Sequence, residues 1–335
     1  EDLLFLVEPI RDKLTTVKHI VVISQSGTMP ATNLSPVYLY DDLLWQQNES
    51  YDFPDDLNER DPAVICYTSA TTGQPKGVVY THRGIVMHTY GIVATLGVSE
   101  SDTALHIVPM FHVNGWGAPF GALAMGCKQV LPGRDILNMQ KLCSTIAEEK
   151  ITFTGGVPTI WMMLYDYLEK GGTHDFSSLK TIFSGGSACP PALMKGLNEK
   201  YGFPIRQAYG MTETSPMALV SLTKSYMADW PMDRIYDIRG SAGIPALGVE
   251  MKIINERGTE VKMDGREWGE IYLRGPWITK EYFKDPETTR NTFIDGWLHT
   301  GDIGTIDEEG YVRLVDRKKD LIKSGGEWIS SVDIE

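Results

Sequence analysis

The sequence predicts an α/β fold in which mainly parallel sheets with flanking helices are followed by a small β-barrel subdomain. Strand and helix signals alternate along residues 61–236, as expected for parallel strands joined by crossover helices. After about residue 237 the chain changes to short strands separated by glycine turns, which favours a small barrel or sandwich. With 335 residues, 42% of them hydrophobic, the chain is long enough for a large core and two or more domains.

Apolar runs rich in β-branched residues predict the strands, and apolar residues three or four positions apart predict the helices. The predicted strands are 19–23, 63–66, 77–81, 103–109, 152–154, 181–184, 249–253, 269–273 and 311–315. The predicted helices are 3–14, 41–46, 83–96, 136–150, 158–169 and 191–200. Pro158 favours a helix start, because proline is tolerated at the first helical position.

Composition excludes several classes of protein. The formal net charge of −13 argues against a general nucleic-acid surface or an anionic-membrane surface. Four cysteines show no zinc-site spacing, and buried reduced thiols in a cytoplasmic protein are the simplest interpretation. The apolar stretch 113–127 is too short to span a bilayer, no integral membrane segment is expected, and no signal peptide is visible.

The segment from Tyr67 to Gly77 has the composition of a polyphosphate-binding loop. It follows a short apolar strand and combines four Ser or Thr hydroxyls, two glycines, a proline and Lys76. Hydroxyl and backbone N–H groups can donate to phosphate oxygens, and the lysine supplies positive charge. The segment lacks the Walker A pattern, and an ordinary polar loop explains it equally well when it is considered alone.

Two further segments favour nucleotide binding. Ser184-Gly-Gly-Ser-Ala188 follows a predicted strand, so it should lie at the carboxyl edge of the sheet, where its glycines could accept a flat ring. Its alternative is a glycine turn that only tightens a crossover. In Ala208-Tyr-Gly-Met-Thr-Glu-Thr214, Tyr209 could stack on a base, Thr212 could bond a phosphate and Glu213 could bind Mg²⁺. The alternative is a capped helix start.

Two weaker signals remain open from the residues alone. Asp302, in His299-Thr-Gly-Asp302, could accept both hydroxyls of a ribose, and a turn aspartate is the simpler alternative. His112 and Trp116 lie among apolar residues and glycines, which is typical of a pocket wall for an apolar substrate. A core histidine beside a packed tryptophan is the more common arrangement.

The order of these segments, with Asp316-Arg-Lys-Lys-Asp320 after them, resembles the adenylate-forming (acyl-CoA synthetase, or ANL) superfamily. The resemblance covers the chain from about residue 61 onward. Residues 113–116, 275–279 and 318–333 look most like medium- and long-chain fatty acyl-CoA synthetases. The resemblance implies four parts: the remainder of an α/β subdomain at 1–60, a nucleotide- and acyl-binding subdomain at 61–236, a β-barrel subdomain at 237–316, and a hinge with the start of a C-terminal domain at 317–335.

The resemblance implies that ATP activates a fatty acid as acyl-AMP, and that coenzyme A then displaces AMP. The residues that would hold the β- and γ-phosphates are Thr68, Ser69, Thr71, Thr72, Gly73 and Lys76. Those that would hold the adenosine are Gly186, Ser187, Ala188, Tyr209, Gly210, Asp302 and Arg317. Those expected beside the acyl group are His112, Val113, Trp116 and Gly185, with Trp116 gating its tunnel. The expected catalytic residues are Lys76, Thr212, Glu213 and His112. Glu213 would bind Mg²⁺, and Lys319 would be the hinge residue.

Two departures from the family pattern affect these expectations. Ala70 stands where the family usually has glycine, which adds strain of about 1 kcal/mol if that position needs a positive φ. The family's adenylation lysine would lie beyond Glu335, and the start of the N-terminal domain is also missing. The resemblance therefore implies a fragment that is inactive or weak by itself.

Three functions remain open from the sequence. The main hypothesis is a fatty acid–CoA ligase. A ligase for aryl or short thioether acids is an alternative, because pocket size cannot be judged from sequence. A nucleotide- or acyl-binding paralogue without turnover is another, motivated by Ala70 and the missing lysine. The expected partners are fatty acid, ATP and coenzyme A, and a homodimer is implied only because relatives often form one.

Overall fold

A computed structural model describes residues 1–47, 50–68, 74–320, 322–324 and 327–329. The chain forms two compact units, residues 1–57 and residues 58–335. The first unit pairs two short parallel strands and adds short helices before and after them. Its elements are α1 (Leu4–Val7), η1 (Glu8–Lys13), β1 (Ile20–Val22), β2 (Val37–Leu39) and α2 (Tyr40–Trp45). The helix predicted over 3–14 is thus divided in two, and Pro9, which has no N–H to donate, lies just after the division.

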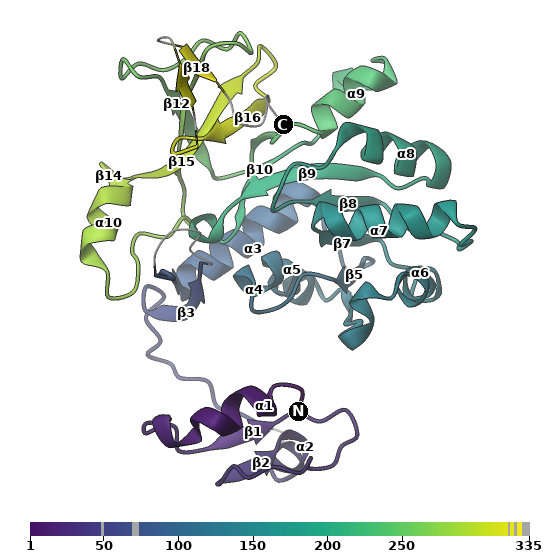
Figure 1. Ribbon diagram of the computed structural model, residues 1–335, viewed down its shortest axis with the longest axis vertical. Coiled ribbons are helices and arrows are strands. Elements are labelled where there is room, and N and C mark those ends of the chain that lie inside the picture. The colour runs from purple at the N-terminus through teal and green to yellow at the C-terminus, as the bar shows by residue number, and fades with distance from the viewer. Residues whose placement is uncertain (48–49, 69–73, 321, 325–326, 330–335) are drawn as a thin grey trace. The chain divides into compact units, whose positions relative to one another are not determined.

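The second unit is built on a seven-stranded sheet with the order β11-β10-β9-β8-β7-β5-β6 (Figure 1). The five strands from β6 to β9 run parallel, and β10 and β11 add an antiparallel edge. The strands are β5 (Thr103–His106), β6 (Lys128–Val130), β7 (Phe153–Gly156), β8 (Thr181–Ser184), β9 (Ile205–Gly210), β10 (Met217–Val220) and β11 (Ile244–Pro245).

Helices cover both faces of this sheet. In β8, the neighbouring residues Ile182 and Phe183 belong to different core clusters, as expected for a strand that is buried on both faces. Ile92 of α3 and Ala122 of α5 share the cluster of Phe183, whereas Trp161 of α7 shares that of Ile182. The helices are α3 (His82–Leu96), α4 (Val113–Trp116), α5 (Ala118–Met125), α6 (Met139–Glu148), α7 (Pro158–Glu169), α8 (Pro191–Tyr201) and α9 (Met232–Arg239), with single turns η2 (Gly133–Leu137), η3 (Thr212–Thr214) and η4 (Ser225–Met227).

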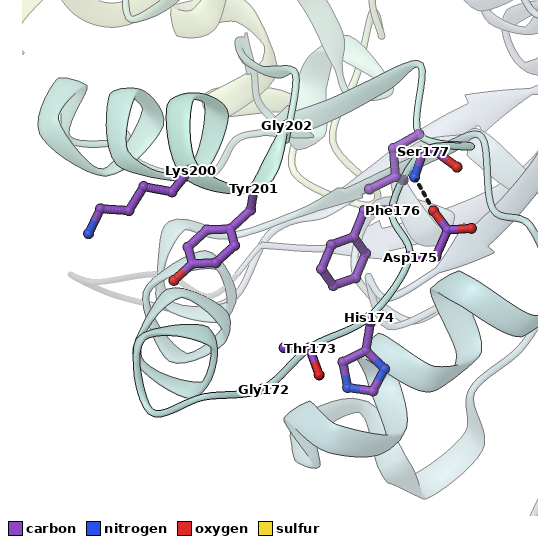
Figure 2. Close-up of a pocket in the computed structure, with 10 residues that line it drawn as sticks. Gly172, Thr173, His174, Asp175, Phe176, Ser177, Lys200, Tyr201 and Gly202 are labelled. Atoms are coloured by element: carbon purple, nitrogen blue, oxygen red, sulfur yellow. Dashed lines mark hydrogen bonds between the residues drawn. The ribbon is translucent and has the colours of Figure 1, made fainter.

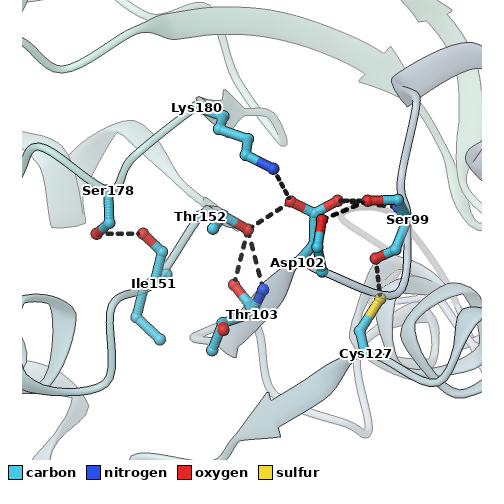
Figure 3. Close-up of polar contacts among 9 residues, drawn as sticks. Ser99, Asp102, Thr103, Cys127, Ile151, Thr152, Ser178 and Lys180 are labelled. Atoms are coloured by element: carbon cyan, nitrogen blue, oxygen red, sulfur yellow. Dashed lines mark hydrogen bonds and ion pairs between the residues drawn. The ribbon is translucent and has the colours of Figure 1, made fainter.

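A buried carboxylate ties the amino ends of three parallel strands together (Figure 3). Asp102 precedes β5, Thr152 precedes β7 and Lys180 precedes β8. Asp102 Oδ1 accepts hydrogen bonds from Thr152 Oγ1 at 2.8 Å and from Lys180 Nζ at 2.7 Å, and Oδ2 accepts from the backbone N–H of Ser99 at 2.9 Å. Burial disfavours the charge, but these donors outweigh it and lower the pKa of Asp102 to about 2.

β3 (Pro62–Tyr67) and β4 (Gly77–Thr81) pair with each other as an antiparallel hairpin outside the large sheet. The predicted strands are therefore present, but this pair does not extend the parallel sheet. The hairpin connects through the Ser/Thr-rich segment of residues 68–76 and leads into α3, whose first turn is capped by Thr81 Oγ1 at 3.0 Å from the Gly84 nitrogen.

A five-stranded antiparallel sheet follows, with β12, β13, β15 and β16 in succession and β14 also paired to β15. Its elements are β12 (Glu250–Ile254), β13 (Trp268–Arg274), α10 (Pro286–Thr292), β14 (Phe293–Ile294), β15 (Trp297–Ile306) and β16 (Val312–Arg317). β17 (Ile322–Ser324) and β18 (Glu327–Ile329) form a last short antiparallel pair. The predicted fold class, a mainly parallel α/β region followed by a small β unit, is confirmed.

Several elements agree closely with the sequence and others were not anticipated. α7 and β8 have the predicted bounds, whereas β9, β10, α4 and α5 were not predicted at all. The four cysteines are buried with free thiols. Among the described residues, none of the helices combines the length and the apolar character needed to cross a membrane.

Candidate active site

A cavity of about 880 Å³ opens at the carboxyl ends of β7, β8 and β9, the edge at which parallel sheets bind ligands. One part of its lining is polar and comes from several segments that are distant in sequence. These residues are Thr68, Lys76, His112, Thr212, Glu213, Thr300, Arg317, Lys318 and Lys319. Another part is apolar and consists of Ile92, Leu96, Leu105, Phe111, Phe153, Phe183, Met217 and Val220.

A second, smaller cavity of about 410 Å³ lies between residues 172–179 and the end of α8 (Figure 2). Its lysine, histidine and aspartate side chains are already paired. Lys200 Nζ lies 2.8 Å from Glu169, His174 is hydrogen-bonded to the hydroxyl of Tyr167 at 3.1 Å, and Asp175 accepts from the backbone N–H of Ser177 at 3.0 Å. These pairs leave little to recognise a ligand, so the larger cavity is the candidate site.

The ends of the predicted phosphate loop are held together at its base. The backbone N–H of Thr68 donates to the carbonyl of Lys76 at 2.9 Å, and the N–H of Lys76 donates to Thr68 Oγ1 at 3.3 Å. Lys76 and Thr68 both line the cavity. The remaining loop residues of the prediction, and the unusual alanine among them, lie outside the described residues; they are Ser69, Ala70, Thr71, Thr72 and Gly73.

Glu213 lies on the short turn η3, with 5% of its surface exposed, and it also lines the cavity. Its Oε1 accepts a hydrogen bond of 2.6 Å from the hydroxyl of Tyr282. Among the described residues, no donor is hydrogen-bonded to its second oxygen, Oε2. The neighbouring Thr212 also lines the cavity, and its carbonyl accepts a 2.5 Å hydrogen bond from Tyr80. Thr214, rather than Thr212, satisfies the backbone of the turn through the N–H of Met211 at 3.0 Å.

Tyr209, Asp302 and Arg317 form one chain of contacts. The Tyr209 hydroxyl donates to Asp302 Oδ2 at 2.7 Å, and Arg317 Nε lies 3.5 Å from Asp302 Oδ1. Asp302 and Arg317 are opposite each other on β15 and β16. Burial raises the pKa of Asp302, although the Tyr209 hydroxyl and the Arg317 charge oppose that shift. Asp302 is thus a strand residue, which corrects the turn-aspartate alternative.

Trp116 lies across two glycines at the strand ends. A Cβ placed on Gly185 would be 3.1 Å from the Trp116 ring, and one placed on Gly155 would be 3.3 Å away, so a side chain at either position would crowd the indole. Val113 is buried beneath the same turn, while His112 is exposed and lines the cavity with Trp116. A core position is therefore wrong for His112.

The Ser184–Ala188 segment contributes less of its length to the cavity than predicted. Gly185, Gly186 and, from β9, Gly210 line it, whereas the exposed residues Ser187 and Ala188 are outside the lining. Gln207 fixes this segment, because its Nε2 donates to the Ser187 carbonyl at 2.8 Å and its Oε1 accepts from the Cys189 N–H at 3.0 Å. Gln207 was not identified from the sequence, where it is an unremarkable strand residue.

The predicted hinge residue Lys319 lines the cavity beside Lys318. Lys318 is fixed at two points. Its backbone N–H donates to the carbonyl of Gly301 at 2.8 Å, and its Nζ lies 2.8 Å from Glu270 Oε2. These contacts hold the segment after β16 against the antiparallel sheet.

The sequence did not identify His88, a buried residue near the site. His88 of α3 is 2% exposed and lies edge-on to Trp277, with their ring centroids 5.8 Å apart; burial lowers its pKa to about 3, so it is neutral.

In the part of the chain that the structure describes, no three His, Cys, Asp or Glu side chains converge as a metal site. A divalent cation would therefore need Glu213 together with oxygens of a bound ligand, a donor set that Mg²⁺ accepts.

The fold and the site together define an adenylate-forming enzyme domain. The ends of its parallel strands carry a hairpin with hydroxyls and a lysine, a turn with a carboxylate, and a Tyr–Asp–Arg chain. The model of the family described as "AMP-binding enzyme" matches residues 4–283, and the chain belongs to that family.

Curated relatives and solved structures agree with this assignment. The chain is 43% identical over 337 residues to a long-chain-fatty-acid–CoA ligase of Thermus thermophilus, covering 100% of this chain and 60% of the relative. It is 40% identical to a medium-chain-fatty-acid–CoA ligase of Ectopseudomonas oleovorans (98% and 60%) and 39% identical to a 3-methylmercaptopropionyl-CoA ligase of Ruegeria lacuscaerulensis (98% and 61%). The anthranilate CoA ligase AuaEII in complex with anthranoyl-AMP aligns with a TM-score of 0.83 at 28% identity, covering 100% of this chain and 61% of that one.

The chain thus spans about 60% of the length of these curated relatives.

Proposed function

We propose that the protein activates a fatty acid with ATP, forming acyl-AMP and pyrophosphate, and then transfers the acyl group to coenzyme A. The observation that carries this proposal is that one cavity is lined by a lysine suited to phosphate, a carboxylate suited to a cation and an apolar wall, which are Lys76, Glu213 and the side chains around Phe153 and Phe183. Asp302, which is suited to a ribose, lies just behind the lining, where it contacts the lining residues Tyr209 and Arg317.

Adenylation requires a fatty carboxylate to attack the α-phosphorus of ATP and release pyrophosphate. Negative charge builds up on the phosphate oxygens, so fixed cationic and hydrogen-bonding groups lower the barrier. In our proposal Thr68 and Lys76 hold the β- and γ-phosphates, together with Ser69, Thr71, Thr72 and Gly73. Thr212 contacts the α-phosphate. Mg²⁺ on Glu213 would neutralise phosphate charge when bound.

The nucleoside would be held by the opposite side of the cavity. Asp302 and Arg317 would take the ribose hydroxyls, and the ring of Tyr209 would lie on the adenine. Gly186 and Gly210 would border the base closely. Ser187 and Ala188 lie outside the cavity lining, so we propose that they border the adenine only through the backbone that Gln207 holds.

The acyl group would extend along the apolar wall. Trp116 lies against the glycine backbone at the strand ends, where it can separate the nucleotide from an acyl tunnel. His112 lies beside it and would face the acyl carboxyl group, with Val113 and Gly185 supporting the turn. This apolar lining supports a hydrocarbon chain more than a short polar acid.

Transfer to coenzyme A would follow after rotation about Lys319, as a single hinge permits. An aryl or short thioether acid is the alternative substrate, supported by relatives and neighbours that carry those names at 39% and 28% identity. A binding paralogue without turnover is the alternative from another class.

The decisive experiment is acid-dependent ATP–pyrophosphate exchange by the intact protein, using a panel of acids from acetate to palmitate plus benzoate and 3-methylmercaptopropionate. We expect exchange to be greatest with octanoate or palmitate. Exchange confined to the aryl or thioether acid would replace the fatty-acid assignment. Exchange with none, alongside measurable ATP binding, would favour the non-catalytic paralogue.

A further inference from the structure

Tyr282 lies between the two charged groups proposed to hold the nucleotide phosphates. It is 5% exposed, and its hydroxyl donates to Glu213 Oε1 at 2.6 Å. On the ring of the same side chain, Lys76 Nζ lies 5.2 Å from the centroid, within the range of a cation–π contact. One aromatic residue therefore contacts both the cation and the carboxylate.

The backbone around Tyr282 is fixed to the hairpin that carries the phosphate loop. Tyr282 forms a β-bridge with Val78 of β4, and the N–H of Phe283 donates to the carbonyl of Gly77 at 2.7 Å. The N–H of Tyr282 itself donates to Thr289 Oγ1 at 3.0 Å. The backbone at Tyr282 is thus fixed both to β4 and to α10, which contains Thr289.

A second connection links the same segment to the turn that carries Glu213. The N–H of Thr279 donates to the backbone carbonyl of Glu213 at 2.9 Å, and Thr279 Oγ1 donates to the carbonyl of Val79 at 2.7 Å. Residues 279–283 therefore join β4 to the turn of Glu213. Burial and the Glu213 charge both raise the pKa of Tyr282, so its hydroxyl keeps its proton and acts as a donor.

We propose that Tyr282 is a positioning residue that sets the distance between Lys76 and Glu213 and holds the Glu213 carboxylate toward a nucleotide-bound cation. This inference rests on the proposed function, because it assumes that ATP binds here. The hydroxyl would act on Glu213 and the ring on Lys76, so the two halves of the side chain can be tested separately.

The test measures ATP affinity of the intact protein by calorimetry, once with Mg²⁺ and once with EDTA. Tyr282→Phe keeps the ring and removes only the hydroxyl. We expect its ATP affinity to fall about tenfold with Mg²⁺, the effect of one hydrogen bond to an ionised group, and to change less than about twofold with EDTA. Tyr282→Leu, which also removes the ring, should weaken ATP binding under both conditions.

A matched control comes from Tyr236, which is 3% exposed and whose hydroxyl donates to Asn198 Oδ1 at 2.9 Å. Tyr236 is not part of the cavity lining. Tyr236→Phe deletes an equally buried hydroxyl and should leave both affinities unchanged. Glu213→Gln provides the second control, because adding Tyr282→Phe to it should cause no further loss of Mg²⁺-dependent affinity. Thermal unfolding should show the two Tyr→Phe variants to be similarly folded.

The outcomes separate the inference from the function beneath it. Wild-type protein that binds no ATP overturns the proposed function and the inference with it. Normal wild-type binding overturns the inference alone if Tyr282→Phe keeps its Mg²⁺-dependent affinity, or loses affinity equally with Mg²⁺ and EDTA. An additive effect of Tyr282→Phe and Glu213→Gln would also overturn it.

Discussion

The hydroxyl of Tyr209, on β9, donates a 2.7 Å hydrogen bond to Asp302 Oδ2, on β15, across 93 residues of sequence. This bond joins the large parallel sheet to the small antiparallel one at the cavity. It also stabilises the charged form of a carboxylate that burial would otherwise favour as the neutral acid. The proposed ribose contact therefore depends on a residue of the other sheet.

Replacing Tyr209 by Phe should make ATP binding more sensitive to acid. Burial already raises the pKa of Asp302, and removing the Tyr209 donor should raise it further. As the pH falls, Asp302 would then lose its charge earlier, and ATP affinity should decline at a higher pH than in the wild type. The ring remains for the adenine. ATP titrations between pH 5 and 8 measure this, and coincident profiles of the two proteins would contradict it.

Replacing Trp116 by Ala should broaden the range of acyl chains that support pyrophosphate exchange. The indole lies against Gly155 and Gly185, and its removal opens the apolar wall. KM for long acids should fall relative to short ones by about threefold to tenfold, since each buried methylene contributes about 0.8 kcal/mol. Trp230→Ala, outside the cavity lining, is the control. An unchanged chain-length profile would count against Trp116 as a gate.

Replacing Lys318 by Gln should affect thioester formation more than adenylation. The 2.8 Å pair with Glu270 holds the segment beside Lys319, and the proposed rotation must release it. Glu270 is buried, but the Lys318 side chain is 66% exposed, so solvent screens the pair to about 1 kcal/mol and the thioester step should accelerate by about twofold to fivefold. Single-turnover assays of the two half-reactions measure this. Equal changes in both half-reactions would show that the pair does not restrain the hinge.

Replacing Asp102 by Asn should destabilise the fold without altering ATP affinity, because Asp102 is at the opposite ends of the strands from the cavity. The folded pKa is about 2 against an ordinary 3.8, which corresponds to roughly 2 kcal/mol of stability at neutral pH. A lowered pKa contributes fully above pH 3.8 and is lost as the pH falls toward 2. The stability difference from wild type, measured by urea unfolding, should therefore narrow below pH 4; a difference that stays constant would contradict this.

The sequence predicted the parts of the site that follow strand ends, because local patterns determine them. β8 is an apolar run followed by glycines, and α7 begins at Pro158, so both were predicted with their observed bounds. α4 and α5 were missed because the stretch is short, apolar and rich in glycine. In α4, Asn114 and Gly115 have positive φ and break the helical pattern.

Long-range pairing could not be predicted. The Thr300–Asp302 segment resembled a turn because it combines glycine and aspartate. Instead it forms a bulge inside β15, where Gly301 has a φ of 72° and the register with β13 shifts. Tyr282 gave no signal, since its contacts with Lys76 and Glu213 depend on how segments far apart in the chain fold together. Gln207 likewise acts on a distant segment, the loop between β8 and α8.

In the proposed reaction a carboxylate attacks the α-phosphate of ATP in this cavity, and the transfer of a labelled carboxyl oxygen to AMP would demonstrate that attack. The intact protein would be incubated with ATP, Mg²⁺, coenzyme A and palmitate carrying ¹⁸O in its carboxyl group. Attack by the carboxylate leaves one of its oxygens on AMP when coenzyme A takes the acyl group, so mass spectrometry should find AMP with one ¹⁸O. Acyl-CoA formed alongside unlabelled AMP, or ¹⁸O appearing in inorganic phosphate, would contradict it.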